Sequence, residues 1–125
     1  MKQAHNLPSV NNFLEEKSVH TMALFHHFII TFKGIANVTL QPTKSMIAVM
    51  TDTRKIAYIT QLGKNFIHVV IPFKQPYTNN LCFQKIAQVP GDAKQFNHHL
   101  RLLSIEDVNE EVIKYMKMAI ELRCS

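Results

Sequence analysis

The spacing of apolar residues changes twice along the chain, and these changes constrain the fold more than any other feature of the sequence. Over residues 19–33, and again from residue 104 onward, apolar side chains recur at the spacing of one helix face. Between residues 37 and 103 this period disappears, and runs rich in β-branched and aromatic residues alternate with turn residues. We therefore predict an α+β fold with a mostly antiparallel five- to six-stranded sheet flanked by N-terminal and C-terminal helices.

Serine residues mark the starts of the predicted helices. Ser9 can cap a brief helix, and Ser18 can cap a longer one that ends near Lys33. Ser104 and Asp107 form a capping-box pattern, which predicts that the last helix starts at Ser104 and runs almost to the chain end. The apolar stripes of the two longer helices are Met22, Phe25, Ile29 and Phe32, and Ile105, Val108, Val112, Met116, Ala119 and Ile120.

Six short runs carry the strand signal: residues 38–41, 46–51, 55–61, 65–73, 81–88 and 95–103. Turn residues such as Pro42, Gly63 and Gly91 lie between them. Most of these links have hairpin length, and short links join antiparallel neighbours.

The size and composition of the chain predict a single domain over residues 1–125. With 125 residues, 46% of them hydrophobic, the chain can bury a core without disulfides. Residues 1–17 are interpreted as a loosely attached N-terminal segment. Cys82 and Cys124 lack the spacing of a disulfide framework, so both are predicted to be free thiols, and Cys82 to be a small buried residue rather than a nucleophile.

Neither a signal peptide nor a membrane span is predicted. Residues 1–8 contain Lys2 but no apolar run after it. Residues 22–32 are too few to cross a bilayer, and His26 and His27 interrupt them. We therefore expect a cytoplasmic protein without a membrane partner.

Basic residues gather in the predicted sheet. From Lys33 to Arg101 there are nine basic residues against two acidic ones, whereas the segment from Ser104 onward has three basic and five acidic. A basic sheet with aromatic residues nearby can bind nucleic acid through phosphate contacts and base stacking. Lysines at strand ends also serve solubility and protect sheet edges, so the charge alone leaves both interpretations open.

The usual signatures of catalysis and metal binding are missing. His26 and His27 point to different sides of a helix, and His98 and His99 alternate across a strand, so neither adjacent pair has the spacing of metal ligands. No paired carboxylates fall in the predicted strands, and no P-loop, G-x-G-x-x-G or G-x-S-x-G motif occurs. We predict neither a metal nor a cofactor.

A polar pocket on the sheet is the remaining candidate for a site. In the last strand Phe96, His98, Leu100 and Leu102 share one face, and Asn97, His99 and Arg101 share the other. The predicted ligand-binding residues are Lys44, His68, His98 and Arg101. The alternative is that the two histidines are half-buried structural residues and that Arg101 pairs with a helix carboxylate.

The order of these elements and three local motifs resemble a bacterial family named domain of unknown function 5655. The similar features are "TKSMIAV" (residues 43–49), the aromatic-rich middle strands, and His98 with Arg101 before "IEDVNEEVIKYMKMAIE". The resemblance covers nearly everything after Val10 and implies the same fold. Some relatives carry a zinc-ribbon-like segment, but this chain has no cysteine pair there, so a zinc role does not carry over. The family name assigns no activity.

The function remains open at this point, with three hypotheses. The first is a non-enzymatic binding or accessory module for an anionic ligand or nucleic acid. The second is an enzyme in which His68 or His98 acts as acid or base while Lys44 and Arg101 hold an anion. The third is an interaction domain whose homodimer buries a second sheet face, because the predicted helices can cover only one face well.

Overall fold

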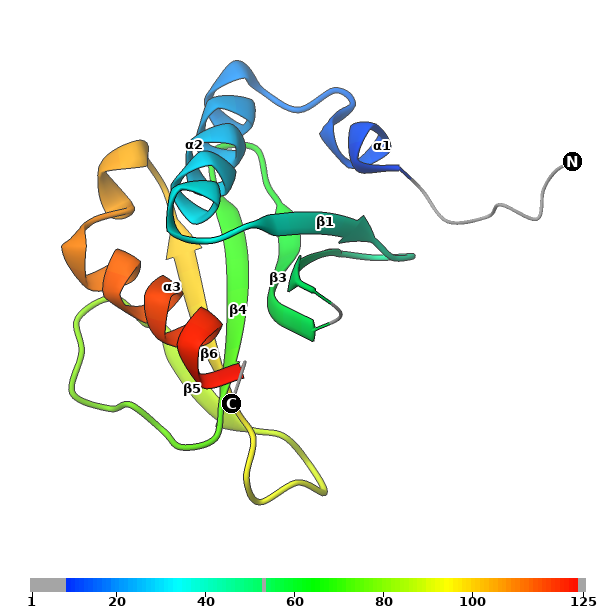
Figure 1. Cartoon of the computed structure of the whole chain (residues 1–125). Helices are drawn as coiled ribbons and strands as arrows, with labels where there is room; N and C mark the ends of the chain where they lie inside the picture. The colour runs from blue at the N-terminus through cyan, green and yellow to red at the C-terminus, as the bar shows by residue number, and fades with distance from the viewer. Residues whose placement is uncertain (1–8, 53, 124–125) are drawn as a thin grey trace, which may run out of the picture.

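The computed structural model describes residues 9–52 and 54–123 and confirms the α+β fold (Figure 1). Its helices are α1 (Val10–Leu14), α2 (Val19–Ile35) and α3 (Glu110–Arg123), with a 3₁₀ turn η1 (Ile105–Asp107) before α3. Its strands are β1 (Val38–Pro42), β2 (Ile47–Thr51), β3 (Arg54–Leu62), β4 (Ile67–Phe73), β5 (Lys85–Gln88) and β6 (Phe96–Leu102).

The six strands form one antiparallel sheet in the order β1-β2-β3-β4-β6-β5. Strands β1 to β4 are a meander, in which each strand pairs with the one before it. After β4, residues 74–84 cross β6 to the outer edge, where β5 starts, and β6 then returns between β4 and β5. The last two strands are therefore exchanged relative to their order in the chain.

Helices α2 and α3 cover the same face of the sheet (Figure 1). Alternate residues of the central strands point toward them, because side chains alternate along a strand: Ile67, Val69, Ile71 and Phe73 of β4, and Leu100 and Leu102 of β6. Val112, Met116 and Ala119 of α3 meet these residues. We call this side of the sheet the closed face.

Most of the predicted stripe of α2 is buried on the closed face. Met22 is only partly buried, and Leu24 and Phe28 are fully buried instead. The rings of Phe28 and Phe32 meet edge to face, with centroids 5.3 Å apart. The apolar face of this helix is therefore wider than the stripe predicted from its period.

The C-terminal helix starts six residues later than predicted. The Asp107 carboxylate does accept the backbone N–H of Ser104, at 3.2 Å, as a capping box requires. These two residues cap only the turn η1, however, because Asn109 then caps α3 by accepting the N–H of Val112 at 3.0 Å. Two successive caps divide the predicted helix into a turn and a shorter helix.

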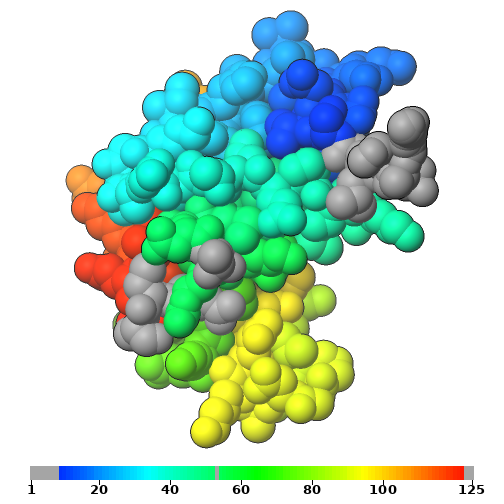
Figure 2. Space-filling view, turned by 45° about the vertical axis from the view of Figure 1, so that its right-hand side comes forward, coloured from blue at the N-terminus to red at the C-terminus, as the bar shows by residue number. Residues whose placement is uncertain are grey.

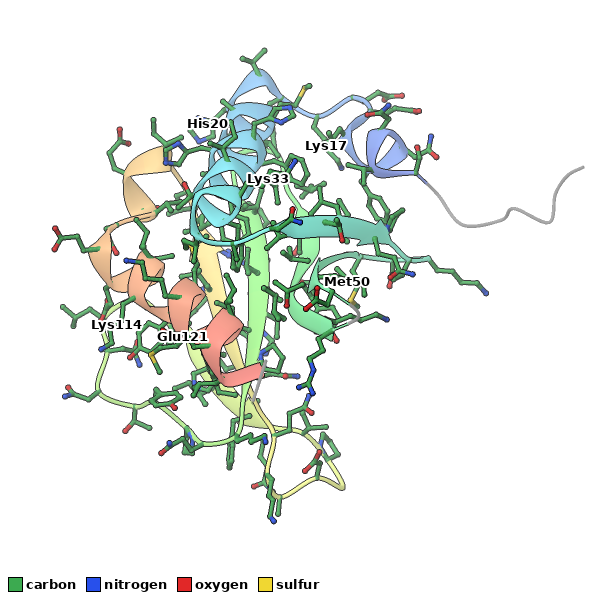
Figure 3. All side chains as sticks on the ribbon, viewed as in Figure 1. Lys17, His20, Lys33, Met50, Lys114 and Glu121 are labelled. Atoms are coloured by element: carbon green, nitrogen blue, oxygen red, sulfur yellow. The ribbon has the colours of Figure 1, made fainter. Side chains whose placement is uncertain are left out.

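The N-terminal elements are tied to the closed side. Ser9 caps α1 through the N–H of Asn12, as predicted, and α1 packs against the same core. At the start of α2, the His20 ring donates to the carbonyl of Leu103 across 2.6 Å (Figure 3). Residues 1–8 of the predicted loose segment lie outside the described residues.

The opposite side of the sheet is here called the open face. It carries Tyr58 of β3, His68 and Val70 of β4, and His99 and Arg101 of β6. All three described α-helices pack against the core on the other side. Within the described part of the chain, no helix combines the length and apolar character needed to cross a membrane.

Candidate anion-binding site on the open face

Two histidines from different strands form a hydrogen bond on the open face. His68 Nε2 of β4 lies 2.9 Å from His99 Nδ1 of β6, and their ring centroids are 5.2 Å apart. The register places them diagonally, because His68 pairs with Arg101 and Val70 with His99. A neutral imidazole has one N–H and one acceptor nitrogen, so one ring donates to the other.

Two cations flank this histidine pair. Arg101 lies directly opposite His68 in the register, and Lys85 of β5 lies opposite His99. Burial lowers the pKa of His68, and the positive charges of Arg101 and Lys85 lower it further. The pKa of His99 is lowered first by burial, then by His68 and Lys85. The pair is therefore neutral near pH 7 and takes up a proton only in more acidic solution.

A glycine and an aromatic ring position Arg101. Its guanidinium carbon lies 4.5 Å from the centroid of the Phe66 ring, a cation–π contact. The Phe66 ring in turn lies where a side chain at Gly63 would be, since a Cβ there would be 2.1 Å from the ring atom Cε1. The turn between β3 and β4 thus needs glycine so that the ring can hold the guanidinium.

A shallow hollow of about 390 Å³ adjoins the histidine pair. Its apolar walls include Tyr58 and Val70, and its polar lining includes Thr60, Gln95, Asn97 and His99. Gln95 comes from the β5–β6 hairpin, which projects beyond the rest of the molecule (Figure 2). His99 belongs to both the hollow and the histidine pair, so the two form one continuous site.

His98, a predicted site residue, lies on the closed face. It is 0% exposed, and its Nε2 accepts the backbone N–H of Tyr77 at 3.0 Å while its Nδ1 donates to the carbonyl of Phe96 at 2.9 Å. Phe73 and Phe83 meet its ring edge to face. Both ring nitrogens are used internally, and burial lowers the pKa of His98. It fixes the crossing segment of residues 74–84 to β6.

The structure therefore brings together two of the four predicted residues, His68 and Arg101. Lys44 lies exposed in the β1–β2 turn, and it is not among the charges that lower the pKa of His68 or His99. Sequence reasoning missed His99 and Lys85 as site residues. Alternation along β6 had grouped His99 with Arg101, but only the register between β4 and β6 shows which histidine of the adjacent pair meets His68.

Cys82 is not a reactive thiol. It lies in the crossing segment, and burial together with the nearby Glu111 carboxylate raises the pKa of its thiol to about 12. A thiol with such a pKa carries almost no thiolate at neutral pH. Among residues 9–52 and 54–123, no three histidine, cysteine or acidic side chains gather in a way that could hold a metal ion. Cys124 lies outside the described residues.

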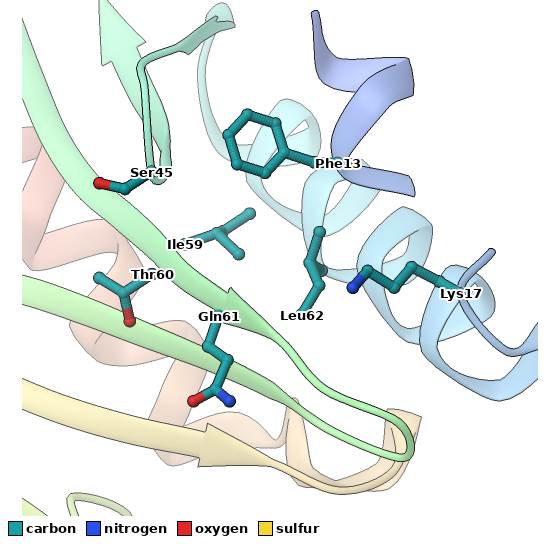
Figure 4. A pocket seen from close by; sticks show the side chains of 7 residues that line it. All are labelled: Phe13, Lys17, Ser45, Ile59, Thr60, Gln61 and Leu62. Atoms are coloured by element: carbon teal, nitrogen blue, oxygen red, sulfur yellow. The ribbon is translucent and has the colours of Figure 1, made fainter. Parts of the chain in front are cut away.

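Two other hollows offer less to an anion. One, of about 320 Å³, lies where α1 meets the end of β3, and Lys17 is the one charged side chain in its described lining (Figure 4). The other, of about 620 Å³, borders β6 and η1, and its lining includes the carboxylates of Asp107 and Glu111 beside Arg101. The first hollow offers a single cation, and the carboxylates of the second repel an anion, so the open face with its two cations is the better candidate.

Comparison with known proteins gives no relative, since no family model, curated protein or solved structure matches the chain. The resemblance to the domain of unknown function 5655 family stays a prediction. The geometry of the open face is therefore the basis on which a function can be argued.

Proposed function

We propose that this protein is a non-enzymatic binding module that holds an anionic ligand on the open face of its sheet. The observation that carries the proposal is the His68–His99 hydrogen bond of 2.9 Å, set between the cations Arg101 and Lys85. Imidazole N–H groups, a guanidinium and an ammonium are all donors to anionic oxygens.

No strand of the sheet supplies a carboxylate to this site, although Arg101 also borders the neighbouring hollow that Asp107 and Glu111 line. None of the six strands contains aspartate or glutamate. Cations on neighbouring strands destabilise each other when no anion lies between them. A bound anion would remove this repulsion, which supports an anionic ligand over a cationic or purely apolar one.

The number of N–H donors that the histidine pair offers to a ligand depends on its protonation. In the neutral pair one N–H lies between the rings, so a single N–H and a single acceptor nitrogen remain for other partners. Uptake of one proton converts that acceptor nitrogen into a second N–H donor. Anion binding is therefore expected to be accompanied by proton uptake below neutral pH.

Calorimetric titration with pyrophosphate at low salt tests the proposal. We expect saturable binding, and about tenfold weaker affinity in Arg101→Ala and in Lys85→Ala, because each variant removes one cation from the site. Lys44→Ala is the matched control, since it removes an equal charge from an exposed turn whose lysine does not act on the histidine pair. Its affinity should equal that of the unaltered protein.

Three outcomes would contradict the proposal. The first is an absence of binding by pyrophosphate, phosphate and single-stranded oligonucleotides at low salt. The second is an equal loss of affinity in Lys44→Ala, which would indicate attraction by net charge alone. The third is turnover of a phosphate ester that depends on His68, which would favour the enzyme hypothesis instead.

A further inference from the structure

We propose that the ligand is a nucleoside phosphate, whose base lies in the hollow beside Tyr58 and whose phosphate lies against His68, Arg101 and Lys85. This inference rests on the proposed function and goes further by naming the chemical class of the ligand. Its basis is the position of His99, which lines the amphiphilic hollow and also belongs to the histidine pair that Arg101 and Lys85 flank.

The hollow and the cations lie at the spacing of two parts of one small molecule. Tyr58, Val70, His99 and Lys85 form a row across four strands, each opposite the next in the register. Arg101 lies two residues beyond His99 along β6, which corresponds to about 6.6 Å along a strand. A ligand that fills the hollow and reaches Arg101 therefore needs a body, a short spacer and an anionic end.

The lining of the hollow fits a flat heterocycle better than a bare anion. Tyr58 offers an aromatic face and Val70 an apolar surface, and a nucleobase stacks on such groups. Its volume of about 390 Å³ also falls in the range of small-molecule sites, about 300–1,000 Å³. Phosphate or sulfate alone would leave most of this space and its apolar walls unused.

Two amide side chains give the hollow both donors and acceptors. Gln95 and Asn97 line it from the β6 side, and neither side-chain amide has a hydrogen-bond partner among the described residues. An amide can donate and accept at once, which matches the edge of a nucleobase. A fatty acid would leave these amides unpaired, and a sugar phosphate would leave Tyr58 and Val70 without an apolar partner.

The test compares three ligands by calorimetric titration of the full chain: a nucleoside monophosphate, ribose 5-phosphate and the nucleoside alone. We expect the nucleotide to bind at least tenfold more tightly than ribose 5-phosphate, because only the nucleotide fills the hollow. Tyr58→Ala should reduce this ratio severalfold, and Tyr58→Phe should retain it, since phenylalanine preserves the stacking surface. Circular dichroism establishes that each variant is folded.

The outcomes separate this inference from the proposed function. If ribose 5-phosphate and the nucleotide bind equally well, the inference is wrong and the anion site stands. If neither phosphate binds, this inference is wrong, and the pyrophosphate titration decides whether the anion site stands. If the nucleotide is preferred but Tyr58→Ala leaves the ratio unchanged, the base lies elsewhere and the inference is also wrong. A short single-stranded oligonucleotide serves as the last arm, because tighter binding than the mononucleotide would identify the source as nucleic acid.

Discussion

His98 and His99 are neighbours in the chain, yet they belong to two different regions of the molecule. His98 points to the closed face, where Tyr77 and Phe96 engage both of its ring nitrogens. His99 points to the open face, where one nitrogen meets His68 and the other has no described partner. The same side chain is a structural anchor in one place and a candidate ligand contact in the other.

This difference follows from burial and from partners rather than from residue type. On the closed face, helices and the crossing segment exclude water, so both ring nitrogens of His98 need internal partners. On the open face the rings are only partly buried, so water or a ligand can complete their hydrogen bonds. A histidine in a strand thus acquires its role from the layer that it faces.

The largest effect on stability is expected when His98 is removed from the closed face. His98→Ala should lower the free energy of unfolding by about 2–4 kcal/mol, because it leaves a cavity among aromatic rings and two unpaired backbone groups. Urea denaturation measures the change. His99→Ala is the matched control, and we expect it to cost less than about 1 kcal/mol because that site is partly exposed. Equal costs would contradict the distinction between the two faces.

A smaller effect is expected at the turn that supports the open-face site. Gly63→Ala should cost about 1–3 kcal/mol, because the new methyl group overlaps the Phe66 ring and displaces it. Arg101 then loses its aromatic support, so pyrophosphate affinity should also fall.

Gly34→Ala provides the control for this substitution. A Cβ at Gly34 has no atom within 4 Å, and the residue lies inside α2, where alanine favours the helix. We expect Gly34→Ala to be neutral or slightly stabilising, with unchanged affinity. If Gly63→Ala also leaves the free energy of unfolding and the pyrophosphate affinity unchanged, the Phe66 ring does not hold Arg101 in the way proposed.

The most modest effects concern pH, and they should have opposite signs for stability and for binding. The pKa values of His68, His98 and His99 are all lowered in the folded chain, with burial as the first cause. The unfolded chain therefore binds more protons below about pH 6.5, and the free energy of unfolding should fall as pH falls through this range. Denaturation at pH 5.5 and 7.5 checks the sign.

Anion affinity should rise severalfold as the pH falls from 7.5 to 5.5, because a proton on the His68–His99 pair adds a positive charge and an N–H donor. Sulfate is the suitable probe, since its own charge is constant there. His99→Asn should flatten this dependence. An affinity that is independent of pH in the unaltered protein would show that the pair takes no part in binding.

Alternation along the last predicted strand gave the two faces of β6 correctly, but it did not predict the site. The predicted site grouped His98 with His68. Alternation shows which residues of one strand share a face, but it does not show which residues of the neighbouring strand lie on the same side of the sheet. That relation depends on strand order and register, and residues 74–84 alter the order by carrying β5 past β6. The start of α3 was missed for a local reason, since both Ser104 and Asn109 are good caps.

The exchanged order of the last two strands also has a consequence for the synthesis of the protein. Strands β1 to β4 can pair as they leave the ribosome, because each finds its partner immediately before it in the chain. Strand β5 emerges before β6, the strand with which it pairs, so it must wait for residues 96–102. Until then the edge of β4 is also exposed, and unpaired edges are sites of aggregation. Completion of the sheet is therefore a late step that waits for β6.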